Sequence, residues 1–404
     1  MANSFTLKKK NNIFTGLFVV VTIIFLIAIG QYLKLQNIVT GGLLPGLFLL
    51  SLFYDTKSFH KNNSEFIWFL LMFIGGLASI FYYQFYDPYI INLRSFFGAV
   101  LSAYIPLALN KNKDYSFYFH IGYIISAFLL IAIMYDNGNF RFGNFASIVD
   151  YRDRFMLNAN AYSYFSFFAN FSLFFLHRKY KFKLLNILLL VLPILFLVIS
   201  FVTQSRSGLI LIILINIVYW IFINVPRHNN SLKKTFRKVI IIIALIGFAL
   251  KFVDVYQNSK IKSRIEGTSQ EDSRGSLIVN SMEVFYMSPI LGVGLGQLPL
   301  FNKIGQFSHN SYVEILAEQG IIGGIMLVML FGIPLRKSLA LLKEKPDDPD
   351  YRLLLLFFIS FYFYNNLYVF YKFPFSMMYF FLVISMQNKL YTIMKNQSLN
   401  YVKP

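Results

Sequence analysis

The sequence predicts an all-α integral membrane protein. Of its 404 residues, 57% are hydrophobic and 14% are charged, whereas a soluble domain carries about 25% charged residues. Its 47 Phe and 27 Tyr exceed what a soluble core of this length can bury, and the mean hydropathy is +0.57. The apolar runs are continuous rather than alternating, which argues against a membrane β-barrel. We therefore expect about twelve transmembrane helices in one polytopic domain, residues 1–404.

Each predicted helix is an apolar run of about the ~20 residues needed to cross a bilayer. The run at 239–253 is the shortest and could extend into the next loop. The first run has no small-residue cleavage site, so we expect a retained helix rather than a signal peptide. In order, the predicted helices cover residues 13–32, 38–54, 66–86, 93–109, 117–135, 159–176, 184–203, 208–224, 239–253, 311–335, 353–371 and 374–392.

Positive charge orients the chain. With the N-terminus inside, 24 of the 37 Lys and Arg residues fall in cytoplasmic segments, as the positive-inside rule requires. We expect a multi-pass protein of the plasma membrane with both termini in the cytoplasm. These basic helix ends explain the net charge of +19, so no nucleic-acid partner is expected. The chain has no Cys, which excludes disulfides, thiolate metal sites and a cysteine nucleophile.

The predicted outer face is enriched in arginine. Seven of its 13 cations are Arg, against five of the 24 inner ones. Because a guanidinium binds phosphate or carboxylate through two hydrogen bonds, the bias indicates an outer site for a polyanionic ligand; chance in small numbers is the alternative. Two outer loops are long, 136–158 and 254–307, and long connections in a tightly looped protein are usually functional.

Arg206 is the first candidate site residue. It lies in the polar turn Thr203-Gln-Ser-Arg-Ser-Gly208, between two strongly apolar helices. The small residues Ser205 and Gly208 make a tight turn that would point Arg206 back over the helices, and Ser205 is itself a candidate substrate ligand. The alternative is an interfacial Arg that reaches toward lipid headgroups.

Arg274 is the second candidate. It begins an amphipathic stretch of the long outer loop, which predicts a short helix lying along the membrane surface. The turn Gly292-Val-Gly-Leu-Gly296 follows this helix. No strand precedes these glycines and the chain has no Walker A motif, so neither a dinucleotide nor ATP is expected.

His309 and Asn310 directly precede a predicted helix. Ser311 and Glu314 fit a capping box, so the helix should begin at Ser311 and use Glu314 as a structural cap. His309 is the one plausible outer side chain that titrates near neutral pH, which makes it a candidate proton acceptor; a purely structural His is the alternative. Asn310 is a candidate substrate ligand beside it.

A fourth polar segment, 151–160, enters the predicted sixth helix from outside. Its polar side chains could bind sugar hydroxyls or phosphate, or be ordinary interfacial groups; they are Arg152, Arg154, Asn158 and Asn160. No His, Asp and Glu cluster has metal-ligand spacing, and no paired outer carboxylates suggest a glycosidase. We expect neither a metal nor a cofactor.

In this order and spacing, the motifs resemble the O-antigen ligase and Wzy-type polymerase superfamily. The resemblance covers about residues 200–330. Around Asn158-x-Asn160 the similarity is looser, because Ala159 stands where the family has Pro. The residues that carry the resemblance are Ser205-Arg-Ser-Gly208, Arg274, Gly292-x-Gly-x-Gly296, His309-Asn310 and Glu318-x-Gly320-Ile-Ile-Gly323.

The resemblance implies a metal-independent, inverting glycosyltransferase with a GT-C-like fold, acting at the outer face of the membrane. The donor would be an oligosaccharide on undecaprenyl diphosphate. Arg206 and Arg274 would stabilise the leaving diphosphate. His309 would act as a general base on the acceptor hydroxyl, or only as a hydrogen-bond donor to phosphate.

Three functions stay open. A polymerase would transfer a repeat unit onto another lipid-linked unit during synthesis of capsule, O-antigen or exopolysaccharide, beside a flippase and a chain-length regulator. A ligase would transfer the glycan to a lipid core, wall or protein acceptor. A flippase or other transporter would need charged residues in the middle of its spans, where this sequence has almost none.

Overall fold

The computed structural model describes residues 12–54, 63–138, 159–180, 182–203, 205–224 and 273–401, and within these ranges it contains helices and no strand. The all-α prediction is thereby confirmed. Seven helical stretches among the described residues are long and apolar enough to cross a membrane, which agrees with a multi-pass membrane protein. They are Ile13–Tyr32, Ser64–Phe81, Tyr86–Lys111, Ser116–Asp136, Lys183–Val202, Arg206–Ile223 and Ser311–Glu344.

The predicted count of twelve spans is not confirmed. The run at 239–253 lies outside the described residues, as do residues 139–158 and 254–272 of the two loops predicted to be outside. Four further predicted runs are helices that do not meet the length and hydropathy expected of a span; they are the shorter apolar helix Gln36–Leu52, α8 (Ala159–Lys179), α16 (Pro349–Asn365) and α17 (Pro374–Tyr401). Each is shorter than a typical span or interrupted by polar residues.

The chain divides into two compact units, and each is described by itself. The first unit comprises residues 1–126, 273–346 and 357–404, and the second comprises 127–272 and 347–356. Helix α7 (Ser116–Asp136) and α16 each contribute residues to both units. The other helices of the first unit are α1 (Ile13–Ile24), η1 (Phe25–Ile29), α2 (Gly30–Tyr32), α3 (Gln36–Ile38), η2 (Val39–Leu43), α4 (Leu44–Leu52), α5 (Ser64–Ala78), η3 (Ser79–Phe81), α6 (Tyr86–Asn112), α13 (Ser273–Met287), α14 (Leu298–Phe301), α15 (Ser311–Glu344) and α17.

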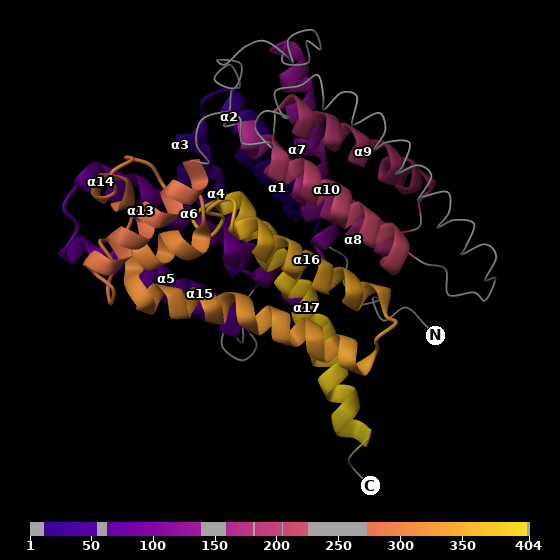
Figure 1. Cartoon of the computed structure of the whole chain (residues 1–404). Coiled ribbons are helices and arrows are strands. Elements are labelled where there is room, and N and C mark those ends of the chain that lie inside the picture. The colour runs from indigo at the N-terminus through magenta and orange to yellow at the C-terminus, as the bar shows by residue number, and fades with distance from the viewer. Residues whose placement is uncertain are drawn as a thin grey trace. The chain divides into compact units, whose positions relative to one another are not determined.

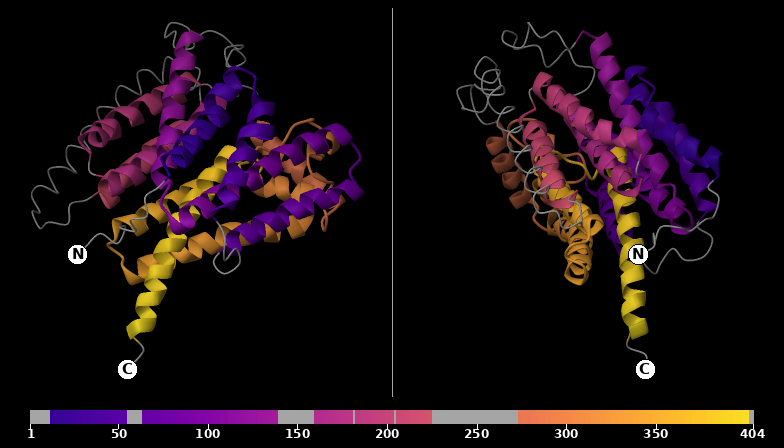
Figure 2. Two further views of the ribbon diagram at one scale, coloured as in Figure 1. Left: turned by 180° about the vertical axis from the view of Figure 1, so that it is seen from behind. Right: turned by 90° about the vertical axis from the view of Figure 1, so that its right-hand side faces the viewer.

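Two helix pairs form the core of the first unit. Helix α17 packs along α6, and α15 packs along α5 (Figure 2). Large tyrosines fill the space between helices. Their hydroxyls donate hydrogen bonds to backbone carbonyls, because a buried tyrosine hydroxyl usually finds a hydrogen-bond partner. The Tyr89 hydroxyl donates to the Leu77 carbonyl at 3.0 Å, and the Tyr123 hydroxyl donates to the Phe375 carbonyl. The abundance of aromatic residues is therefore used for packing inside the unit.

Helix α15 is interrupted at Gly320. This residue has φ +63° and ψ −162°, a conformation that is essentially confined to glycine. The break exposes helix carbonyls to the glycine-rich turn after α13. Val293 N–H donates to the Ala317 carbonyl at 2.9 Å, and Gly294 N–H donates to the Glu318 carbonyl at 2.9 Å. The turn is thus fastened to the first part of α15, directly after the segment that carries His309.

The second unit is built on three mutually packed helices (Figure 1). These are α8, α9 (Lys183–Val202) and α10 (Arg206–Val218), which η6 (Tyr219–Ile223) continues. Gly208 allows the close approach of α10, because a Cβ there would lie 2.4 Å from the Ser163 Cβ. Ion pairing between Arg178 and Asp350, at 2.8 Å, joins the end of α8 to the start of α16.

Candidate active site

His309 is held in an unusual backbone conformation before α15. Its φ of +53° lies in the left-handed region, which few residues other than glycine adopt, although His is enriched there. The side chain is half-buried, and its ring stacks on Tyr368 with centroids 6.4 Å apart and planes 16° apart. Neither ring nitrogen forms a hydrogen bond with any residue that the structure describes. The described residues thus leave both nitrogens to other partners.

The surroundings of His309 favour its neutral form. Burial lowers the pKa of His309 below its ordinary value, the nearby Glu314 carboxylate opposes this shift, and the Arg274 guanidinium adds to it. Because the net effect is a lowered pKa, the imidazole is uncharged at neutral pH and can accept a proton.

Arg274, at the start of α13, acts on His309 electrostatically, so the structure brings these two predicted site residues together. The guanidinium is half-buried and makes no hydrogen bond or ion pair with the described part of the chain. Helix α13 packs on α15 through Leu277, Ser281 and Val284. Tyr286 lies on another side of the helix and is 72% exposed.

The capping box predicted at Ser311 is also wrong. The N-cap of α15 is Asn310, whose Oδ1 accepts from the N–H groups of Tyr312 and Val313 at 3.0 and 3.2 Å. Asn is as good an N-cap as Ser, so the sequence alone placed the cap one residue late. The Ser311 hydroxyl instead donates to Asn365 Oδ1 at 2.6 Å. Asn310 uses its oxygen for the helix and keeps its amide nitrogen for other partners.

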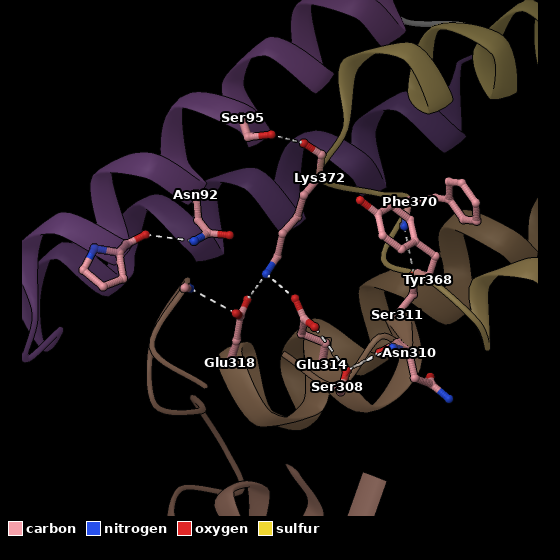
Figure 3. Close-up of polar contacts among 12 residues, drawn as sticks. Asn92, Ser95, Ser308, Asn310, Ser311, Glu314, Glu318, Tyr368, Phe370 and Lys372 are labelled. Carbon is pink, nitrogen blue, oxygen red and sulfur yellow. Dashed lines mark hydrogen bonds and ion pairs between the residues drawn. The ribbon is translucent and has the colours of Figure 1, made fainter. Parts of the chain in front are cut away.

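Glu314 does not cap the helix, because it belongs to a buried ion cluster (Figure 3). Lys372 Nζ lies 2.7 Å from Glu314 Oε1 and 2.6 Å from Glu318 Oε2. All three side chains are at most 4% exposed. Ser308 donates to the second oxygen of Glu314 at 3.1 Å, and Gly296 N–H donates to Glu318 at 3.1 Å. The sequence did not predict this carboxylate pair, nor any role for Lys372.

A metal is not favoured at this cluster, since the lysine ammonium already occupies the space between the two carboxylates. Elsewhere in the described ranges, no three His, Asp or Glu side chains are grouped as metal ligands. The one signal that could have found the cluster is Lys372 itself, a single cation between two apolar runs.

The remaining described candidates belong to the second unit. Ser205 is the N-cap of α10: its hydroxyl accepts from Gly208 N–H at 3.3 Å, and its side chain is buried. Arg206 is the first helical residue and is half-buried. Because Gly208 lies against Ser163 of α8, Asn160 lies at the same end of this helix group as Arg206. Arg152, Arg154 and Asn158 lie outside the described residues.

Comparison with known proteins identifies the segment that carries most of these residues. No curated protein matches the chain. Residues 188–328 match the model of the family described as O-antigen ligase. The matched segment contains Arg206, Arg274, His309, Asn310 and Glu318. The match confirms the resemblance seen in the motifs and supports the placement of this protein in the O-antigen ligase-like family.

Proposed function

We propose that the protein is a polysaccharide polymerase. It transfers an oligosaccharide repeat unit from undecaprenyl diphosphate to the acceptor sugar of another lipid-linked unit, at the outer face of the plasma membrane. The family match supports transfer of a lipid-linked glycan. The observation that carries the proposal is a half-buried His309 whose ring nitrogens bind no described residue, beside an Arg274 that has no ionic partner in the described part of the chain.

The reaction is a single displacement with inversion. The acceptor hydroxyl oxygen forms a bond to the anomeric carbon of the donor, while the bond from that carbon to the diphosphate oxygen breaks. The hydroxyl proton passes to His309, a general-base role that contributes typically about 10²–10⁴-fold. The electron pair of the broken bond stays on the diphosphate, which leaves as an anion.

Arginine side chains stabilise that anion. Arg274 makes no hydrogen bond or ion pair with the described residues, so all of its guanidinium N–H groups can bind the diphosphate. Two parallel N–H groups of a planar guanidinium match phosphate oxygens better than a lysine ammonium does. Preorganised cations in a site with little water are worth more than the same cations in bulk water. The amide nitrogen of Asn310, which donates to no residue that the structure describes, adds a neutral donor next to His309.

The other assignments rest on the sequence motif and the family. Arg206 is assigned to the same diphosphate. Ser205 orders the start of α10 by capping it, and Asn160 binds sugar or phosphate together with Arg152, Arg154 and Asn158. The proposal includes cytoplasmic termini, a GT-C-like arrangement of about twelve spans, metal-independent chemistry, and cooperation with a flippase and a chain-length regulator.

A ligase is the second candidate, and the family description itself favours it. The chemistry at the donor is the same, and only the acceptor differs. Purified protein in vesicles with lipid-linked repeat units alone separates the two: a polymerase forms a ladder of longer lipid-linked chains, whereas a ligase forms product only after a different acceptor is added.

The same assay tests the arginine assignments. Arg206→Lys and Arg274→Lys keep the charge but lose the fork, so each should reduce product formation strongly while the protein stays abundant. Arg336→Lys is the matched control, because Arg336 is exposed at the far part of α15; it should be nearly silent. Full activity in both outer variants would remove bidentate diphosphate binding from the mechanism.

A further inference from the structure

Lys372 is a fully buried cation that the mechanism above does not use. It lies in the loop 366–373 between α16 and α17, and it is 3% exposed. Its two partners, Glu314 and Glu318, stand one turn apart on α15 and present their carboxylates to it. Buried charges persist only when they are paired and hydrogen-bonded. The cluster therefore fixes the loop onto α15.

The loop that Lys372 fixes also covers the imidazole of His309. Tyr368 stacks on the His309 ring. The Tyr368 carbonyl lies 3.0 Å from the Ser311 hydroxyl, and Phe370 N–H donates to the same hydroxyl at 3.3 Å. Figure 3 shows Tyr368 and Phe370 above the start of α15, with Lys372 on the same loop. One face of His309 is thus defined by a loop from a distant part of the sequence.

The cluster reaches His309 from a second side. Glu314 accepts a hydrogen bond from Ser308, and the same serine oxygen accepts from Asn310 N–H at 3.1 Å. These two residues flank His309 in the chain. A left-handed residue persists only where its surroundings over-determine it, and here both neighbours are tied to a carboxylate that Lys372 holds in place.

We propose that Lys372 is a positioning residue for His309: by bridging Glu314 and Glu318 it fixes both the Ser308–Asn310 segment and the loop that carries Tyr368. The inference rests on the proposed function, in which His309 takes the proton from the hydroxyl of the acceptor sugar. Lys372 itself touches neither the donor nor the reacting atoms. Arg274 binds the donor from another helix and does not depend on the cluster for any hydrogen bond or ion pair.

The test compares two lysines that each form an ion pair with a buried glutamate of the same unit. Lys372→Met removes the ammonium from the cluster. Lys337→Met is the matched control, because Lys337 Nζ pairs with the buried Glu65 at 2.6 Å and with Asn388 at 2.7 Å, near the other end of α15. Both variants should be less heat-stable than the parent. Per folded molecule, only Lys372→Met should lose kcat, by about 10²-fold as expected for a misplaced catalytic group, with the donor KM unchanged.

Two milder variants keep the test decisive if Lys372→Met does not accumulate. Lys372→Arg retains a cation between the carboxylates and should restore most of kcat. Tyr368→Leu leaves every ion pair in place but removes the ring that faces His309, so kcat should fall while the donor KM stays constant. Normal kcat in Tyr368→Leu, or equal kcat in the two methionine variants, would overturn the positioning role.

His309→Gln in the same assay separates this proposal from the proposed function. If His309→Gln is inactive and the Lys372 and Tyr368 variants are fully active, only the positioning role fails. If His309→Gln itself turns over normally, His309 is not the base, whatever the Lys372 variants do.

Discussion

Replacing Gly320 with alanine should destabilise the protein by about 2–4 kcal/mol. The backbone there, at φ +63° and ψ −162°, costs a non-glycine residue about 1–3 kcal/mol. A Cβ would also lie 2.2 Å from the Ile290 carbonyl oxygen, so that the backbone must move. The movement would break the 2.8 Å hydrogen bond from Ile321 N–H to the Pro289 carbonyl, which is worth about 0.5–1.5 kcal/mol.

The assay is unfolding of purified protein in detergent, with Gly332→Ala as the matched control. Gly332 is in the same helix α15, and a Cβ there meets nothing within 4 Å. Alanine in a helix interior is favoured over glycine by about 0.5–1 kcal/mol, so Gly332→Ala should be neutral or slightly stabilising. Equal stability of the two alanine variants would refute the argument that the break in α15 requires glycine.

Two further predictions concern the charge on His309 and the orientation of the chain. Because Arg274 lowers the pKa of His309 and Glu314 raises it, Arg274→Gln should move the acid limb of the rate–pH profile to higher pH, and Glu314→Gln should move it to lower pH. The sign follows because the base is lost when pH falls through its pKa; shifts in the opposite directions would remove His309 from the titration. A Cys at Tyr286, which is 72% exposed on α13, should react with impermeant reagents in whole cells, whereas a Cys at the exposed Lys345 should not. The chain has no native Cys, and reversed labelling would invert the predicted topology.

Local patterns in the sequence were sufficient to predict the helices and to recognise the motifs in their order. Long apolar runs predict helices because the backbone must satisfy its hydrogen bonds internally in lipid, and α1 and α9 begin within a residue or two of the predicted positions. The pairing of His309 with Arg274 was also accessible. Both residues belong to one region of the sequence that the charge pattern predicts to lie outside, and the family resemblance includes both.

Contacts between distant segments could not be predicted from local patterns in the sequence. Lys372 pairs with carboxylates more than fifty residues earlier in the chain, and no periodicity within either segment indicates this pair. The break at Gly320 was missed for a related reason. A single glycine is tolerated in a helix at about 1 kcal/mol, so only the packing of the 292–296 turn shows that this one interrupts α15.

The most direct test of the central claim is the rate of glycan transfer by His309→Gln in vesicles, measured with donor affinity. Gln, like His, has a Cβ at the backbone position with φ +53°, and its side-chain amide keeps a hydrogen-bond donor. It cannot take up the proton of the acceptor hydroxyl. We predict turnover about 10²–10⁴-fold below that of the parent protein, with donor affinity unchanged because the arginines that we propose to bind the diphosphate are still present. Turnover within a few-fold of the parent, at equal abundance and equal donor affinity, would contradict a general-base role for His309.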